Sequence, residues 1–304
     1  MTSTSLPDLL LNSAYLECPR WHDGALWVSD FYLHSVLRMT EDGVRTVIAE
    51  VPAQPGGLGW YRDGRLVVAS MLNRQVLRER DGSGFEVLAD LSGLTAWPLN
   101  DLAVDGDDNV YVGEFGFDVM SYAPLRPGSI FRIRPDGRAD RVAEDMWFPN
   151  GMAVTGDGEL VVAETFAQRL TGFRIGTDGV LENRREWASF GAVPRSRELV
   201  EILGGLSVAP DGICIDQEGA AWVADCIHQR AVRVRAGGAI VDEVRSGGAG
   251  VFACALGGAD SRTLFLCCAP SFDEADRKVT RDAFLRRFRV MVPGVVGGAV
   301  SQGF

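Results

Sequence analysis

Short runs of alternating apolar and polar residues, separated by turns that contain Asp and Gly, recur along this chain. Each copy has an apolar strand, an Asp/Gly turn and a second β-rich strand that ends in a small or acidic residue. Six copies are recognisable, of which the last is the most degenerate, and they end at Asp30, Ser70, Glu114, Glu164, Asp225 and Cys268. The pattern predicts an all-β protein built from a repeated unit.

A second pair of alternating strands follows each of the first five copies, as in SVLRMTEDGVRTVIAE after Asp30. Four strands in a unit of roughly 40 to 50 residues are typical of a β-propeller blade. Six units therefore predict a six-bladed β-propeller with four-stranded blades around a central channel, and residues 1–304 are expected to form one domain. To close the ring, Phe284–Pro293 is expected to supply the third strand of the last blade and Pro7–Tyr15 its outermost strand.

The longest spacing between copies contains residues 194–206, PRSRELVEILGGL. Its apolar residues Leu199, Ile202 and Leu203 have the spacing of a short helix. Two placements are open for this insertion. It covers the face that carries the candidate ligands, or it packs on the edge of a blade.

Composition and charge narrow the class of protein. Hydrophobic residues make up 46% of the chain and charged residues 23%, which is typical of a folded globular protein. A formal charge of −11 disfavours nucleic acid and anionic membranes as partners, and no apolar run approaches the roughly 18 residues of a spanning helix. Met1–Leu11 lacks the basic region of a secretory signal, and the six cysteines lie mostly in apolar strands without CxxC spacing. We therefore expect reduced thiols and a cytoplasmic location.

Aligning the copies brings four oxygen-bearing side chains to one position, where the first strand of a repeat begins. They are Glu17, Asn100, Asn150 and Asp211. Because matched positions of different blades are related by rotation about the propeller axis, these side chains should converge. Two anionic and two neutral ligands carry a charge of −2, which suits one divalent cation. Oxygen ligands favour calcium, magnesium or manganese over zinc.

Two repeats lack such a ligand, and a simpler interpretation exists. The second copy has Gly57 at the aligned position, and the sixth has an apolar stretch at residues 252–254. Asn150 and Asp211 each precede a glycine, as residues of ordinary turns do. Two observations argue against the interpretation that these residues only form turns. Glu17 is a poor turn former, and all four polar residues share one register.

The motifs at these positions resemble those of the senescence marker protein/gluconolactonase/regucalcin family. The resemblance spans essentially the whole chain, and its motifs are Glu-x-Pro-x-Trp at 17–21, Asn-Asp at 100–101, Pro-Asn-Gly at 149–151 and Pro-Asp-Gly at 210–212. It implies a six-bladed propeller that hydrolyses lactones with one divalent cation in the central channel. We expect calcium, with magnesium, manganese or zinc as alternatives. By position, Glu17, Asn150 and Asp211 match the family's metal ligands and Asp211 also its general base, while Asn100 matches a substrate-contacting residue.

One departure from the family bears on the substrate. Sugar-lactone hydrolases of this family tend to carry Arg two residues before the Asn, where this chain has Pro98. The substitution removes a donor for polyol hydroxyls, so a simple sugar lactone is not expected. Phe115 and Trp147 lie just outside the inner-strand positions, and we expect them to contact an apolar or aromatic small molecule. Asp118, in the loop after the inner hairpin of the third blade, is expected to contact polar groups of the substrate. The alternative is that the aromatic residues only pack between blades.

Other chemistry is not supported by a motif, because the chain has no GxSxG, HExxH or GxGxxG sequence. Two alternatives to a lactonase remain open. One is hydrolysis of phosphotriester or fluorophosphate bonds at the same cation site. The other is a non-catalytic propeller that binds a protein or small ligand and keeps the cation for structure.

Overall fold

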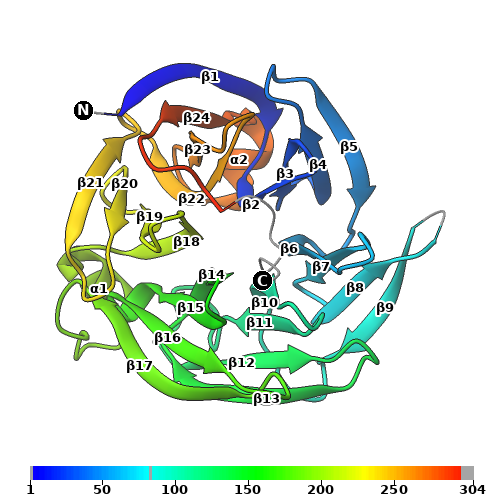
Figure 1. Cartoon of the computed structure of the whole chain (residues 1–304). Coiled ribbons are helices and arrows are strands. Elements are labelled where there is room, and N and C mark those ends of the chain that lie inside the picture. Colours follow the sequence, from blue (N-terminus) through cyan, green and yellow to red (C-terminus); the bar gives the residue numbers. More distant parts are fainter. Residues whose placement is uncertain (1–2, 82–83, 296–304) are drawn as a thin grey trace.

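The strands of this chain form six four-stranded sheets in a ring, as the computed structural model of residues 3–81 and 84–295 shows (Figure 1). The innermost strand of each sheet contacts the innermost strands of both neighbouring sheets, so the ring is closed. The prediction of a six-bladed β-propeller with four-stranded blades is confirmed.

In the first three blades the strands follow one another from the ring axis outward. Blade 1 contains β2 (Leu16–His22), β3 (Ala25–Asp30), β4 (Ser35–Met39) and β5 (Arg45–Glu50). Blade 2 contains β6 (Pro55–Trp60), β7 (Leu66–Ser70), β8 (Gln75–Glu79) and β9 (Phe85–Asp90). Blade 3 contains β10 (Leu99–Val104), β11 (Val110–Glu114), β12 (Gly128–Ile133) and β13 (Ala139–Met146).

The last three blades keep this order except at the ring closure. Blade 4 contains β14 (Pro149–Val154), β15 (Glu159–Glu164), β16 (Arg169–Ile175) and β17 (Leu181–Ser189), with the 3-10 turn η1 (Thr165–Ala167). Blade 5 contains β18 (Pro210–Ile215), β19 (Ala221–Asp225), β20 (Arg230–Val234) and β21 (Ile240–Arg245), preceded by α1 (Leu199–Gly205). Blade 6 contains β22 (Gly250–Gly257), β23 (Thr263–Ala269), β24 (Ala283–Arg289) and β1 (Thr4–Ser13), with α2 (Glu274–Thr280).

The outermost strand of blade 6 comes from the N-terminal segment, as the sequence predicts. Strand β1 pairs antiparallel with β24, with Leu9 opposite Leu285. The Asp8 carboxylate and the Arg286 guanidinium form an ion pair of 2.7 Å between the same two strands. Strand β24 ends at Arg289, earlier than the predicted segment. The first and last strands of the described chain are therefore held in one sheet.

Burial follows the blade geometry. The second strands lie between other strands on both sides, and β7 and β11 are buried at every residue, whereas the outermost strand β5 is largely exposed. Apolar side chains fill the space between neighbouring blades. Trp222 of blade 5, for example, is fully buried against residues of β22 and β23 in blade 6. No helix of the described residues is long and apolar enough to span a membrane.

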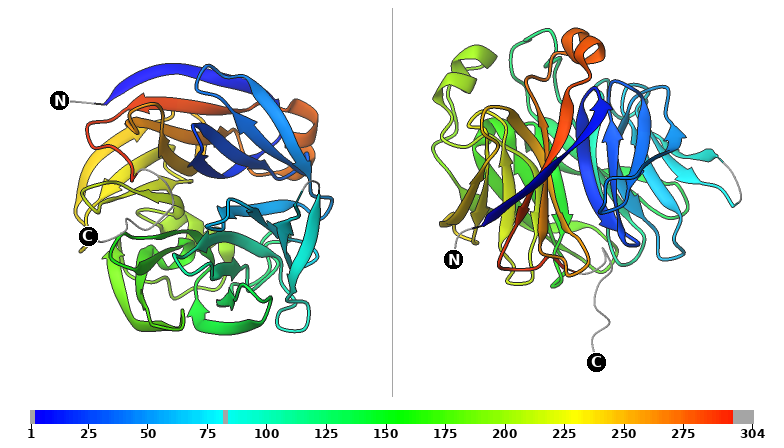
Figure 2. Two further views of the ribbon diagram at one scale, coloured as in Figure 1. Left: turned by 45° about the vertical axis from the view of Figure 1, so that its right-hand side comes forward. Right: turned by 90° about the horizontal axis from the view of Figure 1, so that it is seen from above.

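We call the face at which the inner strands begin the upper face. The helices α1 and α2 and the loop between β11 and β12 all rise from this side of the propeller (Figure 2). Leu199 and Ile202 of α1 pack in one cluster with Phe148 and Ala209. These last two residues lie two positions before the predicted ligands Asn150 and Asp211. The predicted helix within 194–206 is thus present, and it lies on the face that carries those positions.

Candidate active site

The strand register defines six equivalent positions, which we call the ring positions. In blades 1 to 5 the first residue of the inner strand pairs with the last residue of the second strand, and the ring position follows it. The pairing shifts register near this point in every blade, and such bulges re-aim side chains. The ring positions are Glu17, Gly56, Asn100, Asn150, Asp211 and, at the bulge of blade 6, Phe252.

The register corrects one detail of the sequence alignment. Pro55 pairs with Ser70 as Leu99 pairs with Glu114, so the glycine at the ring position of blade 2 is Gly56 rather than Gly57. A Cβ atom on Gly56 would lie 2.7 Å from the carbonyl oxygen of Asn100. Blade 2 contributes no side chain to the ring because its inner strand packs too closely on the next one.

Glu17 and Asp211 are the two carboxylates at the ring positions, and both are buried. Burial raises the pKa of Glu17 well above its usual value, the Asp211 charge raises it further, and the hydrogen bond from the Cys18 amide to Glu17 Oε2 (3.1 Å) opposes both effects. Burial also raises the pKa of Asp211, although the polar side chains of Cys226 and Asn150 act in the opposite direction. Because the Asp211 charge acts on the pKa of Glu17, the two carboxylates lie within electrostatic reach of each other.

The two asparagines are held by hydrogen bonds that tie neighbouring blades. Asn150 Nδ2 donates to Thr165 Oγ1 (3.3 Å), and Thr165 Oγ1 donates to the carbonyl of Pro210 in blade 5 (2.7 Å). Asn100 Nδ2 donates to the carbonyl of Pro149 in blade 4 (3.1 Å). Because the amide nitrogens are engaged in this way, the side-chain oxygens of both asparagines remain available to a ligand.

The chemistry of these residues fits a hard cation. Asp211 Oδ1 is buried and has no hydrogen-bond partner among the described residues, and burying such an atom is unfavourable unless a ligand or proton satisfies it. The described residues contain no cluster of three or more His, Cys, Asp and Glu side chains that could hold a metal. The ring contains only two such side chains, Glu17 and Asp211, because its other two donors are the amides of Asn100 and Asn150.

The residues predicted to contact substrate lie in two different environments. Phe115 and Trp147 are partly buried in the apolar cluster that also holds α1, and the Phe115 ring lies 4.9 Å from that of Phe148. The guanidinium of Arg197 stacks 4.3 Å above the Trp147 ring. Asp118 is exposed in the loop between β11 and β12, where its Oδ1 accepts the amide of Ser121 (3.1 Å). Asp118 therefore shapes its own turn, and no described contact joins it to the ring.

Sequence reasoning did not single out three groups around the ring. Thr165 directly follows the second strand of blade 4, and a search for polar residues one step beyond each strand end would have found it. Tyr15 is buried two residues before Glu17, and its pKa is raised first by burial and then by the charges of Glu17 and Asp211. Asp101 follows Asn100 in the Asn-Asp motif, but its partner Arg20 is distant in sequence.

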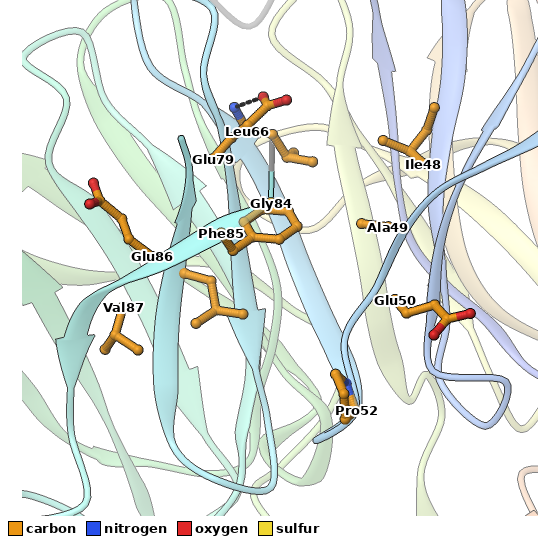
Figure 3. Close-up of a pocket in the computed structure, with 11 residues that line it drawn as sticks. Ile48, Ala49, Glu50, Pro52, Leu66, Glu79, Gly84, Phe85, Glu86 and Val87 are labelled. Atoms are coloured by element: carbon orange, nitrogen blue, oxygen red, sulfur yellow. Dashed lines mark hydrogen bonds between the residues drawn. The ribbon is translucent and has the colours of Figure 1, made fainter. Parts of the chain in front are cut away.

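Two surface pockets of the described residues lie elsewhere. One, of about 390 Å³, lies between the outer strands of blades 1 and 2 and is lined by residues such as Ile48, Phe85 and Val87 (Figure 3). The other lies beside Trp21 and Asp260, between blades 1 and 6. Neither is lined by a ring position, so the chemistry points to the ring rather than to these grooves.

Comparison with known proteins agrees with the motifs. A 6-deoxy-6-sulfogluconolactonase from Pseudomonas putida is 23% identical over 254 residues, which are 82% of this chain and 81% of that protein. Diisopropyl-fluorophosphatase from Loligo vulgaris is 30% identical over 201 residues, 60% of each chain. The crystal structure of regucalcin, a calcium-binding protein from Agrobacterium tumefaciens, superposes with a TM-score of 0.77 at 17% identity over 98% of both chains.

The family model for the SMP-30/gluconolactonase/LRE-like region matches residues 16–269. This range begins just before the ring position of blade 1 and ends with the second strand of blade 6, so it includes all six ring positions. The chain belongs to the SMP-30/gluconolactonase/LRE-like family.

Proposed function

We propose that this protein is a divalent-metal-dependent hydrolase, and that its reaction is the opening of a lactone ring. The observation that carries the proposal is the buried, unpaired Asp211 Oδ1 beside a second buried carboxylate and two oriented amides. Family membership and the gluconolactonase and fluorophosphatase relatives support a hydrolase acting on ester bonds.

Glu17, Asn150 and Asp211 would hold the cation, which is calcium in this proposal because the donors are oxygens and two of them are charged. Magnesium, manganese and zinc are the alternatives that metal analysis would distinguish. A divalent cation supplies polarisation of the substrate carbonyl and charge stabilisation when it is bound. All three side chains come from different blades, so the rigid ring fixes their relative positions.

Asp211 is the proposed general base. Its Oδ1 has no hydrogen-bond donor in the described structure, so a water molecule beside it can pass its proton to this atom. Asn100 is the proposed substrate contact, because its Nδ2 is engaged by Pro149 and its oxygen is left to accept from a substrate group. No covalent nucleophile is required for this reaction.

The substrate is proposed to be apolar or aromatic rather than a simple sugar lactone. Phe115 and Trp147 contribute to an apolar cluster on the upper face, next to the ring. Pro98, which precedes Asn100 by two residues, has no side-chain donor for polyol hydroxyls, although its carbonyl accepts the amide of Phe115 (3.1 Å). Asp118 is retained as a candidate contact only at the exposed rim.

The test combines metal analysis with a hydrolysis screen over aliphatic, aromatic and sugar lactones, before and after chelation. Activity that disappears with a chelator and returns with calcium would support the proposal. A bound cation without turnover of any lactone would instead favour a binding propeller. Failure to take up any divalent cation would refute the site assignment.

Hydrolysis of a fluorophosphate or phosphotriester is the second candidate. It is favoured by the relative of 30% identity, whose name states that activity, although the match covers only 60% of either chain. The same cation site would serve both reactions, because each passes through a more negatively charged oxygen at the attacked centre. Including a fluorophosphate in the screen separates the two candidates.

A further inference from the structure

An ion pair crosses the ring directly beside the candidate cation site. Arg20 of β2 and Asp101 of β10 belong to blades 1 and 3, and blade 2 stands between them in the ring. Arg20 Nη2 donates to Asp101 Oδ1 (2.6 Å), to Asp101 Oδ2 (2.8 Å) and to the carbonyl of Leu102 (2.9 Å). The pair is therefore a short, charge-assisted contact in which one guanidinium nitrogen is shared between both carboxylate oxygens.

Glycine in the inner strand of blade 2 permits this contact. Gly57 is the residue of blade 2 that corresponds to Asp101 in the register. A Cβ atom on Gly57 would lie 2.0 Å from the amide nitrogen of Leu102 and 2.8 Å from Asp101 Oδ1. Any larger residue would collide with the strand that carries Asp101. The glycine thus keeps β6 close to β10 and leaves the space in which Arg20 meets the carboxylate.

Asp101 is fully engaged, unlike Asp211. Its Oδ1 accepts the amide of Leu102 (2.9 Å), its Oδ2 accepts the amide of Met152 (3.2 Å), and only 3% of its side chain is exposed. Asp101 is therefore not a free ligand for a cation. Its charge nevertheless reaches the ring, because it contributes to the raised pKa of both Glu17 and Asp211.

The ion pair changes the net charge of the buried groups around the ring. Three buried carboxylates, Glu17, Asp101 and Asp211, lie within electrostatic reach of one another. Arg20 pairs with Asp101 only, and no ion pair to Glu17 or Asp211 is formed by the described residues. With Arg20, the group has a net charge of −2. Without Arg20, the same group would have a charge of −3.

We propose that Arg20 sets the charge selectivity of the cation site, so that the ring accepts a divalent cation in preference to a trivalent one. This inference rests on the proposed function, because it takes Glu17, Asn150 and Asp211 as the ligands. Arg20 does not touch the cation or the substrate in this scheme. It acts by neutralising Asp101, the one of these three carboxylates that is not a ligand.

The test measures calcium and terbium affinity in four variants by calorimetry and terbium luminescence. Arg20→Gln removes the positive charge, Asp101→Asn removes the negative charge, and the double variant restores the net charge of the wild type. Arg20→Lys keeps the positive charge on a side chain of different shape. Luminescence is suited to the site because Tyr15 lies beside Glu17 and Asp211 and can sensitise bound terbium.

The preference for terbium over calcium is expected to rise about tenfold in Arg20→Gln and to fall about tenfold in Asp101→Asn, since one charge acts on a trivalent ion half as strongly again as on a divalent one. The double variant and Arg20→Lys should lie within about threefold of the wild type. If Arg20→Gln does not fold, Asp101→Asn and the double variant still carry the test.

A purely structural ion pair gives a different result. All variants would then lose affinity for both ions while the ratio stayed constant, which would overturn the inference and leave the proposed function intact. A wild-type protein that binds neither ion would overturn the proposed cation site, and the selectivity role of Arg20 with it.

Discussion

Replacing Asp211 with Asn should have opposite effects on stability in the absence and presence of calcium. Without a cation, Asp211 is a buried acid next to Glu17, its Oδ1 has no partner, and its pKa is raised by burial. The nearly isosteric amide removes the charge and the repulsion. With calcium, however, the variant lacks a charged ligand. The order of the two melting temperatures should therefore invert between chelator and calcium.

The size of the inversion follows from the burial of one acidic group. Burying the unpaired acidic group of Asp211 next to Glu17 destabilises the fold by about 2 kcal/mol relative to a neutral amide. An unfolding entropy of about 2 cal/mol/K per residue converts this to a gain of about 3 °C in Tm for the variant in chelator. Calcium at about 1,000 times its Kd stabilises the wild type by about 4 kcal/mol, or about 6 °C. The wild type should then melt about 3 °C above the variant.

Thermal unfolding of both proteins in chelator and in calcium measures this crossing. Asp105→Asn is the matched control, because Asp105 is also buried but accepts the amides of Asp107 and Asn109 and the hydroxyl of Tyr111, each at 2.9 Å. This control should be less stable than the wild type by a similar amount in both solutions. An Asp211→Asn protein that is less stable in chelator, or that gains as much from calcium as the wild type, would refute the reasoning. Its hydrolytic rate should fall by roughly 100- to 10,000-fold.

Three further changes test the surroundings of the ring. Thr165→Val removes the hydroxyl that holds Asn150, and calorimetry should show calcium affinity about tenfold weaker, with Thr165→Ser close to the wild type. Pro98→Arg should raise turnover of a sugar lactone relative to an aromatic one; an unchanged ratio of kcat/KM would remove Pro98 from the account of specificity. In chelator, Glu17 and Asp211 have raised pKa values in the folded protein, so their contribution to stability should fall as the pH rises from about 4 through those values. The gain in Tm that calcium produces should instead grow with pH, because protons compete with the cation for the carboxylates. Melting curves between about pH 5 and 8 measure both slopes, and Glu17→Gln should flatten them; parallel slopes would contradict the assignment.

The blade repeat was predictable because its signal is local. Alternation of apolar and polar residues, Asp/Gly turns and constant spacing gave six blades, and the N-terminal strand was expected because the last blade lacked a fourth strand. The exact ends of the strands were harder to predict from the sequence. β24 stops at Arg289 although the apolar pattern continues to Val292. The amide of Val290 instead bonds the carbonyl of Arg262, a contact that depends on the turn of the neighbouring strand pair.

The ring was predictable only as far as the repeat register reached. Besides burial, the Asp211 charge raises the pKa of Glu17, as expected for aligned positions that converge, but the alignment was one residue out in blade 2. Two glycines in a row, Gly56 and Gly57, give no apolar pattern with which to set the register. Arg20 was missed for a different reason. Its partner lies 81 residues away, and a contact between non-adjacent blades leaves no periodic signal.

Departures from the repeat determine the chemistry of this ring. Six identical acidic side chains at the ring positions would repel one another strongly, since even two adjacent carboxylates shift each other's pKa. The chain instead places two carboxylates, two amides, a glycine and a phenylalanine there, and it pairs Asp101 with Arg20 beside them. This arrangement sets the net negative charge that remains at the ring, which matters more for cation binding than the number of polar groups there. A cation-selectivity measurement therefore addresses the design of the site more directly than substitution of any single ligand.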